Sequence, residues 1–384
     1  MYFVILCAVA VIYYLIYARR FRKNALEGFE YSAKTSSHEL YEGDEFYLYE
    51  SIVNAKDMPM PNIRVETQLP YGLDFCLYDG ESARRANRNR VESIFVLKPN
   101  NTVDRRWRII AKKRGVYYLG SVHVTVSDLF GIIKIYTHYD MEKGHSNRIT
   151  VLPKTIDIEK CFAPATDPYG DVTTNFNLLS DPLIWAGARE YVGGDPINKI
   201  NWKSTARLHK PMVNIDEYNE KHSYDIIFNI QSQARENEGT VPQNTAISEM
   251  GISLCASIID QSCTKGISVR LLANSVNEDN DGEYFISREY KDRGDLIHAM
   301  RMLAEMRSEI SCRFERMLDK LLAEDILSKN RSIIIISPYV DKETADFTSA
   351  LVDKGIDASI FVTSHRSTAI ELPRSVPVFY KTYK

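Results

Sequence analysis

The segment "YDIIFNI", residues 224–230, decides the fold of the second half of the chain. A continuous apolar run of this length is typical of a strand that is buried on both faces of a parallel sheet. Three similar runs follow it: "ISVRLLAN" (267–274), "SIIIISP" (332–338) and "ASIFVTS" (358–364). Segments with helical spacing separate the runs, for example Ile247, Met250 and Leu254 ahead of Gly266. The alternation predicts an α/β domain over residues 222–384, with a mainly parallel sheet.

Residues 28–153 show a different pattern. Short segments rich in aromatic and β-branched residues, such as "DEFYLYESIVN" (44–54) and "IRVETQL" (63–69), alternate with Gly, Pro and Asn. This spacing, without a long helical period, predicts an immunoglobulin-like β-sandwich. Residues 154–221 then form a connector, which includes the Pro-, Asp- and Thr-rich stretch "ATDPYGDVTTNFNLLSDP" (165–182).

The amino terminus has the pattern of a membrane anchor. "YFVILCAVAVIYYLIYA" (2–18) carries no charge and is followed by "RRFRK" (19–23). A cleaved signal peptide would carry its positive charge before the apolar run. We therefore expect residues 1–23 to be a single transmembrane helix with a basic stop, and the positive-inside rule places the following domains in the cytoplasm. A buried amino-terminal core helix is the alternative interpretation.

Composition agrees with a globular protein in a reducing compartment. The net charge is -3, and the six cysteines are scattered without a C-x-x-C pair. We expect no cofactor. Nucleic-acid binding is not expected either, because no motif that combines aromatic and basic residues supports it.

A candidate site lies in "AREYVGGDPINKINWKSTARLHKP" (188–211). Asp195 followed by Pro196 is a helix-start pattern, and Gly194 permits a turn before it. A helix from Pro196 to about residue 208 would place three cations on one face, at successive steps of four residues: Lys199, Lys203 and Arg207. This face could bind an anion or a partner, or its charges could pair internally while Trp202 packs between domains.

The same segment resembles the bacterial domain-of-unknown-function 58 family. Its pattern, roughly G-x-R-x-Y-x-x-G-D-x-x-x-x-I-x-W-x-x-[ST]-A-R, is met by these residues: Gly187, Arg189, Tyr191, Gly194, Asp195, Ile200, Trp202, Thr205, Ala206 and Arg207. The segment before it, including Asp128-Leu129-Phe130-Gly131, is also similar to the family. The resemblance implies a membrane-anchored protein with a von Willebrand factor A-like domain, and a MoxR-type AAA+ ATPase as partner.

A von Willebrand factor A-like domain can hold Mg²⁺ at a D-x-S-x-S loop. The matching positions here are Asn229, Gln231 and Gln233, and Ser337 replaces a further Asp that is often found. Neutral amides lack the charge on which such sites depend, so we expect no functional metal site.

Three functional hypotheses follow. The first is a membrane-anchored, non-enzymatic adaptor that presents the α/β domain to a cytoplasmic partner. The second is an enzyme of unknown specificity centred on Arg189, Glu190, Tyr191 and Asp195. The third, which the amide loop disfavours, is a metal-dependent ligand-binding domain.

Positive charge is concentrated between Arg84 and Arg114. This stretch holds 11 basic residues, against only Glu92 and Asp104. Such a surface is a candidate for contact with anionic lipid. Solvated strand faces and a loop are the alternative interpretation.

Overall fold

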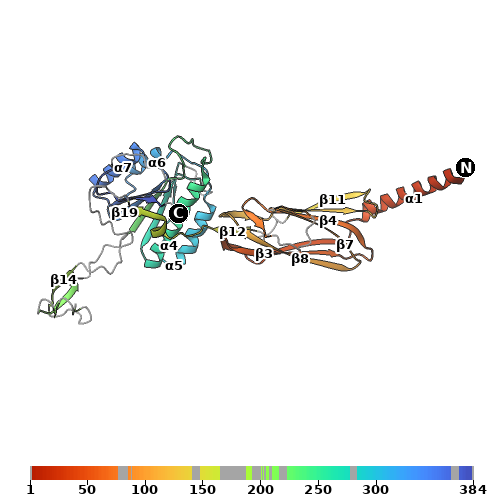
Figure 1. The fold of residues 1–384 in the computed structure, drawn as a ribbon, viewed down its shortest axis with the longest axis horizontal. Helices are drawn as coiled ribbons and strands as arrows, with labels where there is room; N and C mark the ends of the chain where they lie inside the picture. Colours follow the sequence, from red (N-terminus) through yellow and green to blue (C-terminus); the bar gives the residue numbers. More distant parts are fainter. Residues whose placement is uncertain are drawn as a thin grey trace. The chain divides into compact units, whose positions relative to one another are not determined.

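The computed structural model describes residues 2–76, 85–87, 89–140, 148–164, 187–192, 200, 202, 205–206, 210–215, 223–276, 283–364 and 372–382. The chain divides into two compact units, Met1–Lys154 and Thr155–Lys384. Figure 1 shows that the first unit is built mainly of strands, whereas helices pack around a sheet in the second.

The first unit begins with helix α1, Tyr2–Asn24. This helix continues through Arg19, Arg20, Arg22 and Lys23. Within the described part of the chain, no helix is both long enough and apolar enough to cross a membrane. The predicted fold class, which opened with a transmembrane helix, is therefore wrong, and the described chain is mostly β-sheet.

Three sheets make up the rest of the first unit, in the orders β1-β3-β8-β5, β11-β10-β4-β7-β6 and β2-β12-β9. The strands are β1 Phe29–Thr35, β2 Glu39–Tyr41, β3 Glu45–Asn54, β4 Met60–Gln68, β5 Leu73–Phe75, β6 Arg85–Asn87, β7 Arg90–Leu97, β8 Asn101–Ala111, β9 Gly115–Tyr118, β10 Ser121–Ser127, β11 Lys134–Asp140 and β12 Arg148–Leu152. Most neighbours are antiparallel, but β12 pairs with β2 in parallel. This pairing joins the start of the unit to its end.

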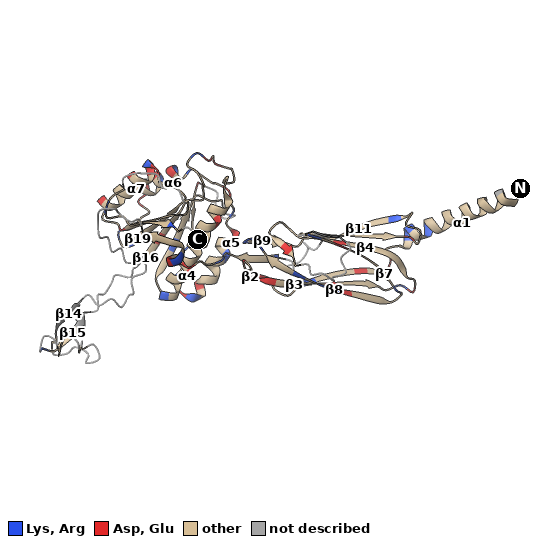
Figure 2. Cartoon of the chain, viewed as in Figure 1, with Lys and Arg blue, Asp and Glu red and all other residues tan. Residues whose placement is uncertain are grey.

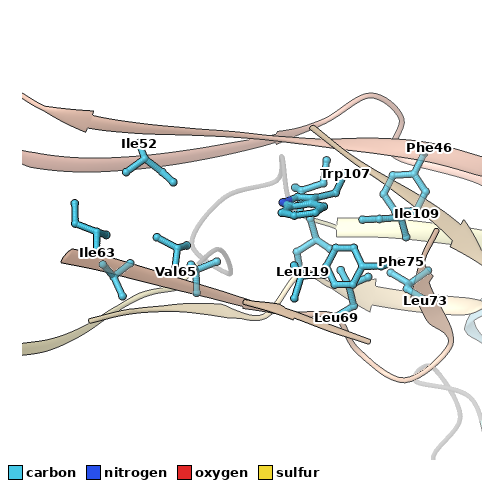
Figure 3. Packing of buried hydrophobic residues seen from close by; sticks show 14 of the residues in the cluster. Phe46, Ile52, Ile63, Val65, Leu69, Leu73, Phe75, Trp107, Ile109 and Leu119 are labelled. Carbon is cyan, nitrogen blue, oxygen red and sulfur yellow. The ribbon is translucent and has the colours of Figure 1, made fainter. Parts of the chain in front are cut away.

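One hydrophobic core fills the space between the two larger sheets (Figure 3). Along β3, inward and outward positions alternate, so that Phe46, Leu48 and Ile52 are buried. Trp107 from β8 meets Phe75 from β5 edge to face, with 5.8 Å between the ring centroids. The period-2 pattern of the sequence therefore becomes the inner faces of two packed sheets.

A charged side chain is buried in this core. Glu50 is 1% exposed and accepts hydrogen bonds of 2.6 Å from the Tyr31 hydroxyl, the Thr67 hydroxyl and Trp107 Nε1. The two hydroxyls bind Oε1, whereas Trp107 binds Oε2, which also lies 2.7 Å from the Arg105 guanidinium. Because both carboxylate oxygens are partnered, the cost of burying the charge is largely offset.

The second unit is organised by a sheet in the order β13-β21-β20-β19-β16-β17-β18. Its described elements are α2 Ile158–Cys161, β13 Phe162–Pro164, β14 Gly187–Glu190, β15 Met212–Ile215, β16 Ser223–Phe228, α4 Thr245–Lys265, β17 Ser268–Ala273, β18 Phe285–Ile286, α5 Arg293–Glu305, α6 Phe314–Ala323, β19 Arg331–Ser337, α7 Lys342–Asp353, β20 Ala358–Val362 and β21 Val378–Lys381. β21, β20, β19, β16 and β17 are parallel to one another. Strands β14 and β15 form a separate antiparallel pair.

Helices cover the sheet because its central strands are apolar on both faces. Ile333 and Ile335 of β19 belong to one cluster with α6 and α7, whereas the alternating Ile334 and Ile336 are buried outside it. Helix α4 contacts β16, β17 and β19. Gly251 of α4 lies so close to the Phe228 ring that an added Cβ would be 2.4 Å from Cε2.

Candidate functional site

The signature segment is anchored by the β14–β15 hairpin. Arg189 pairs with Val213 and Glu190 with Met212, and Tyr191 N donates to the Pro211 carbonyl at 2.8 Å. Met212 and Val213 are buried, which fixes the hairpin at its base. The pairing therefore places the first residues of the signature beside β15, which follows it in the chain.

Only part of the predicted basic helix falls within the described residues. Trp202, Thr205 and Ala206 are helical, and Ile200 forms a bridge with Val213. The Thr205 hydroxyl accepts a 2.9 Å hydrogen bond from Met212 N. The Trp202 side chain is 69% exposed.

The remaining site residues of this segment lie outside the described part of the structure. They are Gly194, Asp195, Lys199, Lys203 and Arg207, together with the side chains of Arg189 and Glu190. The common basic face and the enzyme hypothesis centred on Glu190 therefore stay predictions.

A second polar region lies where the parallel strands end. Asn229 follows β16, Asn274 follows β17 and Ser337 ends β19, and all three are fully buried. Asn229 Nδ2 donates to the Ser337 hydroxyl at 3.1 Å, and Asn274 Nδ2 donates to Asn229 Oδ1 at 3.2 Å. The predicted loop positions thus meet at the carboxyl edge of the sheet, where parallel α/β proteins usually bind ligands.

Gln231 extends this network toward α6. Its Oε1 accepts from Phe314 N at 2.7 Å and from Asn274 Nδ2 at 3.2 Å, while its Nε2 donates to the Glu236 carbonyl at 3.1 Å. Gln233, by contrast, is exposed and contacts only Gln243 among its described side-chain partners, at 3.2 Å. Gln231 is therefore a packing residue and Gln233 a surface residue of the same loop.

Chemically, the network consists of neutral groups that bind one another. Its nearest carboxylate, Glu236, accepts backbone hydrogen bonds from Ser232 N at 2.6 Å and Gln243 N at 2.7 Å. Burial raises the pKa of Tyr339, which also contacts Asn229, so its phenol stays protonated at neutral pH. In the described residues, no group of three or more His, Cys, Asp or Glu side chains is placed to hold a metal ion.

The signature hairpin and this carboxyl edge fall within one sequence family. Residues 187–352 match the family described as "Protein of unknown function DUF58". This part of the chain is a DUF58 domain. The match runs from the first residue of β14 into α7. It names the domain without naming an activity.

Other comparisons add little to the DUF58 match. No curated protein sequence matches the chain. A Salmonella alpha-2-macroglobulin structure is 14% identical with a TM-score of 0.26, over 33% of this chain and 9% of that one. A cohesin from Archaeoglobus fulgidus is 13% identical with a TM-score of 0.20, over 27% of this chain and 80% of that one. A CARDB domain from Pyrococcus furiosus is 11% identical with a TM-score of 0.19, over 33% and 94%. These likenesses are too weak to carry an argument about function.

A charged cluster that the sequence did not indicate lies at the opposite edge of the parallel strands. Asp225 of β16 is fully buried, and its carboxylate oxygens lie 2.7 Å from Arg270 Nη2 and 2.7 Å from Arg331 Nε. Arg331 also reaches Glu289 at 2.7 Å. Because the partners come from three strands, no local motif could indicate the cluster. Its position between strands identifies it as a structural ion-pair network.

The basic stretch of the first unit is partly neutralised across strands. Arg90 pairs with Glu66, Arg105 with Glu50 at 2.7 Å, and Arg108 with Glu45 at 3.2 Å. These acidic partners lie outside residues 84–114. The positive charge at the surface of this stretch is therefore lower than its own residues indicate. Lipid contact through this stretch stays an untested prediction.

Proposed function

We propose that the chain is a non-enzymatic adaptor whose DUF58 domain presents a docking surface to a partner protein. The observation that carries the proposal is Trp202, which is 69% exposed in the middle of the signature segment. An exposed indole leaves a large apolar area in water. Tryptophan is also among the residues that most often dominate the binding energy of protein interfaces.

The surroundings of Trp202 support this role because they are held in place. The Ile200–Val213 bridge precedes the tryptophan, and the Thr205–Met212 hydrogen bond follows it. A side chain on a fixed backbone loses less conformational entropy when a partner binds. The described residues on either side of Trp202, Ile200 and Thr205, are therefore anchored to β15.

The proposed partner is a MoxR-type AAA+ ATPase, because the family resemblance implies such a protein. The interpretation of the DUF58 domain as a von Willebrand factor A-like domain belongs to the same proposal. Localisation at the cell membrane, with the domains on its cytoplasmic side, remains a prediction that cell fractionation and protease protection would test.

The experiment measures the affinity of the purified full-length chain for a purified MoxR-type ATPase from the same organism by calorimetry. We expect Trp202→Ala to weaken binding by about 30-fold, as for an interface residue worth about 2 kcal/mol. Val241→Ala is the matched control, since Val241 is 57% exposed in the same unit but lies outside the signature. Its affinity should stay within about twofold of the parent.

Two results would count against the proposal in different ways. Binding that is unchanged in Trp202→Ala would show that this surface is wrong. Absence of binding by the parent chain would show that the ATPase is the wrong partner.

A further inference from the structure

A tight turn between β10 and β11 holds three apolar side chains away from the core of the first unit. Asp128, which is fully buried, accepts hydrogen bonds from Ile133 N at 2.9 Å through its side chain and from Gly131 N at 3.0 Å through its carbonyl. Asp128 N donates in turn to the Ile133 carbonyl at 3.1 Å. Gly131 adopts a φ of 69°, which a residue with a side chain rarely does. The turn geometry is therefore specified by its own sequence.

The side chains that this turn presents are unusually exposed. Leu129 is 75% exposed, Phe130 73% and Ile132 68%. Side chains of this size are stabilised when they leave water. A buried aspartate thus fixes a turn whose three apolar side chains are stabilised only when another surface covers them. This is expected of an interaction site.

Helix α1 lies against the same turn. Tyr17 is close enough to Asp128 for the carboxylate to raise its pKa, although burial is the larger cause, and the Leu129 backbone also interacts with it. Further along α1, Phe21 packs against the core of the unit, which fixes the base of the helix. Other apolar side chains of α1 are exposed as well, such as Ile16 at 53%.

Positive charge borders this apolar region. Lys134, which is exposed, begins β11 just after the turn. Four more exposed cations follow the apolar part of α1: Arg19, Arg20, Arg22 and Lys23. Figure 2 shows basic residues where α1 meets the β-structure. An apolar tip beside clustered cations is complementary to the acyl boundary and the anionic headgroups of a lipid surface.

We propose that the Leu129–Ile132 turn docks on an anionic lipid surface. The side chains of Leu129, Phe130 and Ile132 enter the boundary between headgroups and acyl chains, while Arg19, Arg20, Arg22 and Lys23 contact lipid phosphates. This site lies in the first unit and goes beyond the adaptor function, so its failure would leave that proposal intact.

The test places a fluorescent reporter on the turn of the full-length chain. Phe130→Trp is compared with Tyr71→Trp, since Tyr71 is a loop aromatic of the same unit that is 79% exposed. Each variant is mixed with phosphatidylcholine vesicles, with or without phosphatidylglycerol, whose acyl chains are brominated. We expect the anionic vesicles to quench the added emission of Phe130→Trp at least twofold more strongly than that of Tyr71→Trp.

Other outcomes would overturn the proposal. They include equal emission from both variants on vesicles that retain the protein, absence of vesicle binding, and equal quenching by neutral vesicles. Shielding of Phe130→Trp that depends on protein concentration without vesicles would instead assign the turn to a second copy of the chain.

Discussion

Asn229 donates a hydrogen bond from Nδ2 to the Ser337 hydroxyl at 3.1 Å, and this bond joins the carboxyl ends of β16 and β19. Asn229→Asp would remove the donor and place a carboxyl in a fully buried position. We expect the free energy of unfolding of the second unit to fall by about 3 kcal/mol at neutral pH, measured by urea denaturation. Burial raises the pKa of the introduced carboxyl above its unfolded value, so the loss should shrink as the pH falls through that pKa.

The control is Gln233→Glu, which adds the same charge to the exposed end of the same loop. Its free energy of unfolding should change by less than about 0.5 kcal/mol. If both variants lost the same free energy of unfolding, disruption of the buried network would not be the cause of the loss.

The second prediction concerns the buried carboxylate of the first unit. Glu50→Gln leaves Arg105 without its counter-ion and replaces one acceptor by a donor facing other donors. We expect a loss of about 3–5 kcal/mol, measured from the unfolding transition of this unit. Glu45→Gln on the same strand removes an ion pair that is 44% exposed at Glu45, and should cost less than about 1 kcal/mol. Similar costs for both variants would contradict a special role for burial.

The third prediction uses two helical glycines. Gly251→Ala would place a methyl group 2.4 Å from the Phe228 ring, which forces a shift of α4 or of the ring. We expect destabilisation of about 1–3 kcal/mol despite the better helix propensity of alanine. Gly294→Ala in α5 meets nothing within 4 Å and should be neutral or stabilising by up to about 1 kcal/mol. Thermal unfolding of both variants measures these changes. A Gly251→Ala variant that is more stable than the parent would contradict the close packing of Gly251 against Phe228.

The fourth prediction concerns thiol reactivity. Burial raises the pKa of Cys263 and of Cys312 to about 11, so near pH 8 only about one thiol in a thousand is ionised. Cys7 is exposed. We expect iodoacetamide to modify Cys7 in the native chain while Cys263 and Cys312 stay unmodified, as mapped by mass spectrometry. All three should react in strong denaturant, and fast native modification of Cys312 would contradict its burial.

Periodic apolar segments could be predicted from sequence because burial on both faces leaves a local pattern. The run at 224–230 overlaps β16, and the helical spacing ahead of Gly266 corresponds to α4, which ends with that glycine in a left-handed conformation. The sequence also indicated Asn229 and Gln231 as positions of one loop, and the structure shows a hydrogen bond of 3.1 Å from Gln231 N to Asn229 Oδ1. A local motif indicates these positions because the loop begins where β16 ends, at Phe228.

Contacts between distant segments could not be predicted in this way. Gln231 accepts its hydrogen bond from Phe314 N, 83 residues along the chain, and Glu50 finds Trp107 57 residues away. The prediction of a transmembrane helix took the cations of residues 19–23 as a stop after the span, whereas helix α1 continues through them to Asn24.

The pairing of β13 with β21 has a consequence for synthesis. Thr382 donates from its hydroxyl to the Lys160 carbonyl, 222 residues earlier, and the strands beside this contact pair in antiparallel fashion. A ribosome releases residue 160 long before residue 382, so β13 must wait without its neighbour while the rest of the sheet is translated. During that interval its unpaired edge can attract other strands. Nascent chains of this protein are therefore prone to aggregation through β13 for a time that is set by the rate of elongation.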